Sequence, residues 1–397
     1  MPRGREFRSI YTTAVHAGEH PCPETGAVDT PIYQSTTFSF ENADAGAALF
    51  SHEKDGYVYT RYGNPTIKAL EDKIAALEAA QTAQVCASGM SAISTCILAQ
   101  LKKGDHVVSA QSIYSATFDF FSRKLPDWGI EVTLLDSTSP LDYVRAIRPN
   151  TRLIYIETPS NPGLKIFDIS AFSKAVQGSG VLLVCDNTFA TPFNTRPLEL
   201  GADLVVHSAT KYLGGHGDAM GGAIVGRREL VEPISVEYHR DLGGVISPFN
   251  AWLVLRGLRT FALRMERHNA NAKQIAEFLS RHPRVDHVSY PGLIAHPDYE
   301  VARRQMRGFG GMLSFTVRGG LEAGKHVLDH VRLCTLAVSL GDTRTLISHP
   351  ASTTHKVIPP ERRLEIGIDD GLIRLSVGIE DVEDLIDDLD QALAGAG

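Results

Sequence analysis

Short apolar segments alternate with helix-like segments between residues 80 and 210, and this alternation limits the possible folds more than any other feature of the sequence. The apolar segments are strand-sized and β-rich: QVCAS, HVVSA, VTLLD, RLIYIE, LLVCD and DLVVHS. Such strands, with helices between several of them, are typical of βαβ units and predict an α/β fold with a mostly parallel central sheet. In these sheets, ligands bind outside the carboxyl ends of the strands.

The segments on either side of the alternation have a different character. Residues 1–62 are rich in Pro, Thr, Ser and Tyr and show little helical period, so we expect an extended N-terminal arm. A helix is expected from Pro65, since proline suits a first helical turn. The apolar residues that follow have helical spacing: Ile67, Leu70, Ile74 and Leu77.

The last third of the chain predicts a second, smaller α+β unit. A long helical pattern covers residues 248–282, and MLSFTVRGG and LIRLSVGIED resemble strands before a closing helix in VEDLIDDLDQALA. We therefore expect three parts: an arm over 1–62, a large ligand-binding domain over 63–255, and a C-terminal domain over 256–397.

Composition excludes several classes of protein. The net charge is −7 and no Lys/Arg run occurs, so nucleic acid is not an expected partner. Five scattered cysteines without a CxxC pair argue against a disulfide framework and a zinc site. His349 and His355 have no acidic or cysteine partner at ligand spacing, so no metal site is expected. The apolar runs are too short for a bilayer, and the N-terminal segment has no apolar signal region, which favours a cytoplasmic protein.

Polar residues at four expected strand ends are candidates for one site. Ser88, Gly89 and Met90 lie where a strand yields to a helix, and backbone N–H groups at a helix N-terminus bind anions; the alternative is an ordinary tight turn. Asp186 follows a buried run and either caps the next helix or keeps a heterocyclic nitrogen protonated. Asn161 either forms an Asn-Pro turn or donates a hydrogen bond to a phenolate oxygen.

Lys211 follows the last of these strands in SATKYLGG, beside the hydroxyls of Ser208 and Thr210. A solvated loop lysine is the simplest interpretation of this lysine alone. A lysine in a desolvated pocket instead becomes a nucleophilic amine. Pyridoxal phosphate (PLP) requires the whole set: an amine for its aldehyde, a carboxylate for its ring nitrogen and a cradle for its phosphate.

Six ordered motifs, SATKYLGGHGD, ETPSNP, DNTF, ASGM, YxRxxNPT and SLGDTRTLISHPASTTH, together resemble the Cys/Met-metabolism (trans-sulfuration) family of PLP-dependent enzymes. The resemblance covers nearly the whole chain and implies the aspartate-aminotransferase-like fold, fold type I. It implies that Lys211 forms the Schiff base and moves protons, that Asp186 pairs with the pyridinium, and that Tyr114 stacks on the ring and protonates the leaving group. It also implies a phosphate cradle at Gly89, Met90, Ser208 and Thr210, which Ser88 adjoins.

The same resemblance extends to the substrate and to a second subunit. Tyr59 and Arg61 resemble the pair that reaches the phosphate of the neighbouring subunit, which implies a dimer as the smallest active unit and a homotetramer of two such dimers. Ser339 and Arg374 resemble the clamp for the substrate carboxylate, since an arginine fork suits a carboxylate. Tyr59 and Ala116 are further residues implied to contact the substrate.

Within the family, the motifs favour γ-elimination on sulfur amino acids, as in methionine γ-lyase, with O-succinyl- or O-acetylhomoserine sulfhydrylase as the alternative. Val338 stands where cystathionine-handling members commonly carry glutamate. Ala116 and Arg240 depart from the lyase pattern, which usually has cysteine and often lysine there. An aminotransferase of the same fold type is a further alternative, as is a non-enzymatic homologue, although Lys211 and the other expected site residues are all present.

Overall fold

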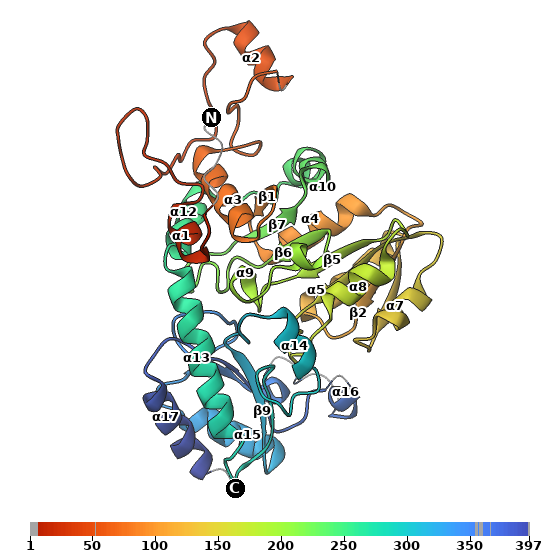
Figure 1. The fold of residues 1–397 in the computed structure, drawn as a ribbon, viewed down its shortest axis with the longest axis vertical. Coiled ribbons are helices and arrows are strands. Elements are labelled where there is room, and N and C mark those ends of the chain that lie inside the picture. Colours follow the sequence, from red (N-terminus) through yellow and green to blue (C-terminus); the bar gives the residue numbers. More distant parts are fainter. Residues whose placement is uncertain (1–6, 52, 354–355, 357–359, 366, 396–397) are drawn as a thin grey trace.

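The computed structural model describes residues 7–51, 53–353, 356, 360–365 and 367–395 (Figure 1). In this part of the chain, a seven-stranded sheet has the order β1-β7-β6-β5-β4-β2-β3. The five strands from β6 to β3 in this order are parallel, and β7 runs antiparallel to both β1 and β6. The strands are β1 (Thr82–Cys86), β2 (His106–Ala110), β3 (Glu131–Leu135), β4 (Thr151–Glu157), β5 (Leu182–Asp186), β6 (Leu204–His207) and β7 (Gly222–Gly226).

The α/β class and the mostly parallel sheet are therefore confirmed, and each expected strand is present. β7 lies in a glycine-rich segment whose three apolar residues, Ala223, Ile224 and Val225, were not recognised as a strand. The helices around this sheet are α3 (Pro65–Leu77), α4 (Gly89–Gln100), α5 (Ser115–Asp119), α6 (Leu125–Asp127), α7 (Pro140–Ala146), α8 (Ile169–Val176), α9 (Thr191–Asn194), α10 (Arg228–Pro233) and α11 (Arg240–Leu242).

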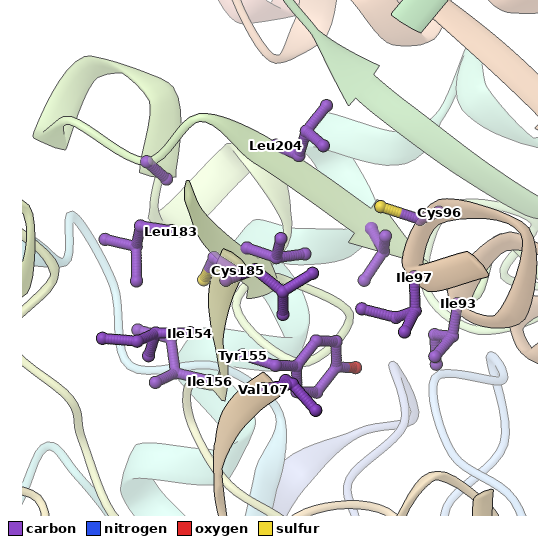
Figure 2. Packing of buried hydrophobic residues seen from close by; sticks show 14 of the residues in the cluster. Ile93, Cys96, Ile97, Val107, Ile154, Tyr155, Ile156, Leu183, Cys185 and Leu204 are labelled. Atoms are coloured by element: carbon purple, nitrogen blue, oxygen red, sulfur yellow. The ribbon is translucent and has the colours of Figure 1, made fainter. Parts of the chain in front are cut away.

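The sheet is covered on both faces, as its apolar strands require. Figure 2 shows packing on both faces: Ile93, Cys96 and Ile97 of α4 lie on the side of Val107 and Tyr155. The side chains of Ile154, Ile156, Leu183 and Cys185 point to the opposite side. On this opposite face, α3 and two helices near residues 248–279 pack against alternate residues of the strands, such as Val205 and Val225. All four apolar residues that predicted α3 are buried, and Asn64 caps its first turn through a hydrogen bond from Thr66 N.

The N-terminal arm, expected to be extended, also contains helical turns. It contains two short helices, α1 (Ile10–His16) and α2 (Ala43–Phe50). The side chains of Ser9 and Asn42 accept backbone hydrogen bonds at the two N-termini, and these caps offset the weak helical pattern. In Figure 1, α2 projects away from the body at the top of the molecule.

The C-terminal part forms the expected smaller α+β unit around a second sheet. Among the described residues, this sheet has five strands in the order β10-β11-β12-β9-β8. Its strands are β8 (Val285–Ser289), β9 (Met312–Val317), β10 (Thr335–Leu336), β11 (Leu346–Ser348) and β12 (Leu372–Ser376). Its helices are α14 (Tyr299–Gln305), α15 (Gly320–His330), α16 (Pro360–Glu365) and α17 (Val382–Ala394).

α12 (Pro248–Leu258) packs in the large unit, and α13 (Phe261–Leu279) connects this unit to the smaller one. The long helical pattern is interrupted between them, where the hydroxyl of Thr260 bonds to the carbonyl of Gly257. Phe261 and Met265 belong to the core of the large unit, whereas Ala272, Ile275, Ala276 and Leu279 belong to the smaller core. Figure 1 shows α13 running from one unit into the other. The division at residues 62 and 255 stays a prediction.

None of the helices in the described residues is long and apolar enough to cross a membrane. All five cysteines are buried and free. The carboxyl ends of β4, β5 and β6 lie along one edge of the large sheet, since Glu157 is in register with Asp186, and Asp186 with Val206. This edge brings together the segments that carry the expected site residues.

Candidate active site

Lys211 lies in the turn that follows β6, and its amine has a defined partner. Its Nζ donates to the hydroxyl of Ser339 at 2.7 Å, although the two residues are 128 positions apart. Burial lowers the pKa of Lys211 to about 8, and the positive charge of Arg374 acts in the same direction. An amine in this environment is a nucleophile near neutral pH, as expected for a lysine that bonds to an aldehyde.

Arg374 of β12 joins the two units at the same place. Its guanidinium donates to Oδ1 of Asn161 at 3.1 Å and to the carbonyl of Ser339 at 3.2 Å. Ser339 has a φ of 102°, a strained value for a residue with a side chain, which is typical of functional sites. Arg374 and Ser339, predicted to bind the substrate carboxylate, therefore lie together next to Lys211.

Asp186 ends β5 as a buried carboxylate with two donors. The hydroxyl of Tyr155 donates to its Oδ2 at 3.1 Å, and the backbone N–H of Thr188 donates to its Oδ1 at 3.0 Å. Burial raises the pKa of Asp186, while the hydrogen bonds from Thr188 and the charge of His207 lower it. Asp186 therefore does not serve as a simple exposed helix cap.

In the turn after β1, the backbone at Gly89 lies very close to Ser208 in the turn after β6. Ser88 caps α4, its hydroxyl accepting from Ser91 N at 3.1 Å. A Cβ on Gly89 would lie 2.7 Å from the Cβ of Ser208, so only glycine fits between the two turns. Thr210 is tied to Gly221, whose N–H donates to the threonine hydroxyl at 3.1 Å. Met90 adjoins this turn in the first turn of α4, and its sulfur accepts from Thr117 at 3.6 Å.

Tyr114 precedes α5, and the residue is 45% exposed. Its backbone N–H donates to Glu157 Oε2 at 2.8 Å, which fixes the start of α5 against the end of β4. Ala116 lies two residues further on and is half-buried. An accessible ring held by its backbone suits stacking on a bound heterocycle.

Tyr59 and Arg61 lie on the arm, where Tyr59 forms a β-bridge with Thr37. The guanidinium of Arg61 donates to the carbonyl of Arg240 at 2.8 Å and lies 4.9 Å from the ring centre of Tyr62. Among the described residues, no hydrogen bond joins Tyr59 or Arg61 to Lys211 or to the turns at Gly89 and Ser208. The structure thus does not bring these two residues into the site of their own chain.

The residues present fit PLP. Lys211 offers an amine of lowered pKa, Asp186 a buried carboxylate, and the Gly89–Ser208 contact a cradle that any Cβ at position 89 would fill. Asn161 uses its side-chain oxygen on Arg374, and among the described residues no acceptor is recorded for its side-chain NH2 group, which could donate to a ring oxygen. The individual roles of these residues stay predictions.

Three neighbours of Asp186 were missed in the sequence: Tyr155, Glu157 and Thr188. Glu157 is buried and in contact with Tyr114, and burial raises its pKa well above the usual range, as does the nearby Asp186. The signal was available, since an acid at the end of the apolar run RLIYIE is as unusual as Asp186 at the end of LLVCD.

His349 has ordinary partners on both ring nitrogens, the hydroxyl of Ser352 at 2.8 Å and the carbonyl of Asp370 at 2.7 Å. His355, the second histidine of that motif, lies outside the described residues. In the described ranges, no group of three or more His, Cys, Asp or Glu side chains could hold a metal ion.

The lowered pKa of Lys211 predicts how covalent attachment of the cofactor depends on pH. Only the neutral amine attacks an aldehyde, so the rate for the apoprotein should fall tenfold per unit below the pKa of about 8 and be constant above it. Mixing apoprotein with PLP from about pH 6 to about pH 10, followed by visible absorbance, measures this profile. A rate still rising steeply at the top of this range would show an unperturbed lysine.

Comparisons with known proteins agree with this geometry. The model of the family described as Cys/Met metabolism PLP-dependent enzyme matches residues 11–394. An L-methionine gamma-lyase of Fusobacterium nucleatum is 50% identical, over 97% of this chain and 98% of its own. An O-succinylhomoserine sulfhydrylase of Pseudomonas aeruginosa is 43% identical, over 98% and 96%. The crystal structure of metB from Corynebacterium glutamicum superposes with a TM-score of 0.92 at 42% identity, covering 98% of this chain and 99% of that one. The chain is therefore a member of the Cys/Met-metabolism family of PLP-dependent enzymes, with the fold expected for it.

Proposed function

We propose that this protein catalyses γ-elimination on sulfur amino acids, converting methionine and water to 2-oxobutyrate, ammonia and a thiol. The observation that carries the proposal is the single cluster formed by Lys211, Ser339 and Arg374, which unites a nucleophilic amine with a carboxylate-binding fork. A substrate carboxylate bound by Arg374 would hold the α-carbon of an amino acid close to the Lys211 amine.

The residues of the chain divide the reaction among them. Bound PLP supplies an electron sink for the negative charge that develops when a substrate C–H bond breaks. Arg374 and Ser339 orient the substrate through its carboxylate. Lys211, whose pKa of about 8 lets its amine both accept and release a proton near neutral pH, takes the α-proton and moves protons between substrate carbons. The Tyr114 hydroxyl donates a proton to the departing sulfur.

A second candidate is the sulfhydrylase reaction, in which a sulfur nucleophile replaces the acyl group of an acylhomoserine. Ala116 favours it, because the side chain here lacks the thiol usual in the lyases. Val338 argues against cystathionine for either reaction: its side chain is 62% exposed near Ser339 and offers no acid for a distal amino group.

One assay separates the two functions. The purified, cofactor-loaded protein is given methionine, or O-succinylhomoserine with and without sulfide, and 2-oxobutyrate and homocysteine are quantified. Rapid 2-oxobutyrate release from methionine supports the lyase. Homocysteine from the acyl ester and sulfide, with little release from methionine, would identify a sulfhydrylase.

Ala116→Cys tests the pocket argument. The thiol is expected to raise methionine turnover relative to acylhomoserine turnover by about threefold to tenfold, because position 116 is implied to contact the substrate. The ratio of kcat/KM values for the two substrates measures the effect, and Ala116→Ser, which has similar size but no thiol, is the control. An unchanged ratio would remove position 116 from the determinants of specificity.

We also propose a cytoplasmic homotetramer of two dimers, each dimer sharing its active sites. The arm supports this assembly, because its helix α2 projects away from the body of its own subunit (Figure 1), and among the described residues no hydrogen bond joins Tyr59 or Arg61 to Lys211. The five free cysteines are in keeping with a reducing compartment.

Arg61→Ala tests the shared site. Loss of a phosphate contact should weaken PLP affinity by about tenfold or more. When Arg61→Ala subunits are mixed with inactive Lys211→Ala subunits, hybrid dimers should regain one intact site and up to about one quarter of wild-type activity. Mixtures without any recovery, measured after reversible dissociation, would contradict a cross-subunit role. Arg123→Ala, an exposed arginine paired with Asp119, is the control.

A further inference from the structure

A buried polar cluster is formed by Glu78, Asn187, Thr195 and His207, and Asn187 directly follows Asp186 in the chain. Each of these residues is at most 3% exposed. Nε2 of His207 is 2.6 Å from Oε1 of Glu78. The amide of Asn187 donates to the same oxygen at 2.8 Å and to the carbonyl of Thr195 at 2.9 Å. None of these side chains has a role in the function proposed above.

The cluster lowers the stability of the fold if its only role is to fill space in the core. One polar atom of each member is buried without a partner among the described residues: Glu78 Oε2, Asn187 Oδ1, Thr195 Oγ1 and His207 Nδ1. A buried ion pair with incomplete hydrogen bonding is commonly less stabilising than apolar residues of the same volume. This stability cost indicates a role other than packing.

Those surroundings are the carboxyl ends of β5 and β6. Asp186 is in register with Val206, the residue before His207, and Asn187 N donates to the carbonyl of Val206 at 3.0 Å. The charge of His207 favours the ionised form of Asp186. Glu78, at the end of α3, holds the imidazole from its other side.

A second buried acid, Glu157, lies beside Asp186, so the charge of His207 affects which of the two carboxyl groups is ionised. Glu157 is in register with Asp186 on the neighbouring strand, and two adjacent buried carboxyl groups cannot both ionise readily. The hydroxyl of Tyr155 bonds to Asp186, whereas the backbone N–H of Tyr114 bonds to Glu157. The titratable groups around the pair are thus Tyr155 and Cys185 in the sheet, together with His207 and Glu78.

We propose that the buried Glu78–His207 ion pair is a positioning element that keeps the negative charge on Asp186 rather than on Glu157. Glu78 holds the His207 ring at the end of β6, and the charge of His207 favours the ionised Asp186 carboxylate. The carboxylate can then pair with a protonated ring nitrogen. This role rests on the proposed function, in which Asp186 faces that nitrogen.

The test compares two cofactors that differ only at the ring nitrogen. Dissociation constants of apoprotein for PLP and for 1-deazapyridoxal phosphate, which has carbon in place of that nitrogen, are measured by fluorescence titration. His207→Asn and the isosteric Glu78→Gln are each expected to weaken PLP binding by about tenfold and to leave binding of the deaza analogue unchanged. The control is His106→Asn, which should change neither dissociation constant. His106 is another buried histidine of the same sheet and bonds to Thr151 and Thr133.

The outcomes separate the inference from the proposed function. Equal losses for both cofactors, in either variant that circular dichroism shows to be folded, would mean a structural role only and would overturn the inference. Unchanged PLP affinity in both variants would do the same. Asp186→Asn shows which of the two ideas is wrong. If this variant selectively loses PLP affinity but His207→Asn and Glu78→Gln do not, only the role of the ion pair is overturned. No selective loss in Asp186→Asn removes Asp186 as the nitrogen partner.

Discussion

Lys211→Ala is expected to abolish covalent attachment of PLP and to lower kcat by at least about 10³-fold. The variant loses the buried amine that burial and Arg374 keep at a pKa of about 8, and with it the group that moves the substrate proton. Among the described contacts of this amine, its partner is the Ser339 hydroxyl, which cannot replace it as a nucleophile toward an aldehyde. Borohydride reduction followed by peptide mass spectrometry locates the attachment directly.

The control for this experiment is Lys165→Ala. Lys165 is 40% exposed and paired with Asp136 at 2.6 Å, so its loss should alter neither attachment nor kcat. Lys211→Ala should still bind PLP without a covalent bond, because the turns at Gly89 and Ser208 are untouched. A reduced adduct on any other lysine, with wild-type stoichiometry, would refute the assignment of Lys211.

Arg374→Ala is expected to lower kcat/KM by about 10²- to 10³-fold, mostly through KM. The guanidinium is held by Asn161 and Ser339, so its fork is oriented before a substrate carboxylate arrives. Such preorganisation reduces the free energy lost when the substrate is ordered. Arg374→Lys should restore only a small part of the loss, because an ammonium cannot bind a carboxylate through two parallel hydrogen bonds.

Two measurements distinguish this effect from damage to the fold. PLP affinity of Arg374→Ala should stay near that of the wild type, and added guanidinium ion should partly recover activity. Arg267→Ala is the matched control, because Arg267 is half exposed on α13 and bonds to the carbonyl of Glu380. An unchanged KM in Arg374→Ala would exclude it from substrate binding.

The sequence by itself determined the class of the fold and the chemistry of the strand ends. Apolar runs separated by helical segments specify βαβ units through local periodicity, and the strands from β1 to β6 follow that pattern. Lys211 and Asp186 were recognisable because a lysine among hydroxyls and an acid after a buried strand conflict with ordinary burial preferences. The sequence did not predict the helices of the arm, because they depend on single capping residues, Ser9 and Asn42, and not on a repeated pattern.

Only the tertiary structure decided which residues meet. Arg374 bonds to Asn161 across 213 positions, because β12 of the second sheet faces the carboxyl edge of the first. Glu157 stands beside Asp186 through the register of β4 and β5, and the Glu78–His207 pair spans 129 positions from the end of α3 to the end of β6. The physical reason is that periodicity records which side of an element is buried, whereas long-range partners depend on strand order and helix packing, which no local pattern encodes.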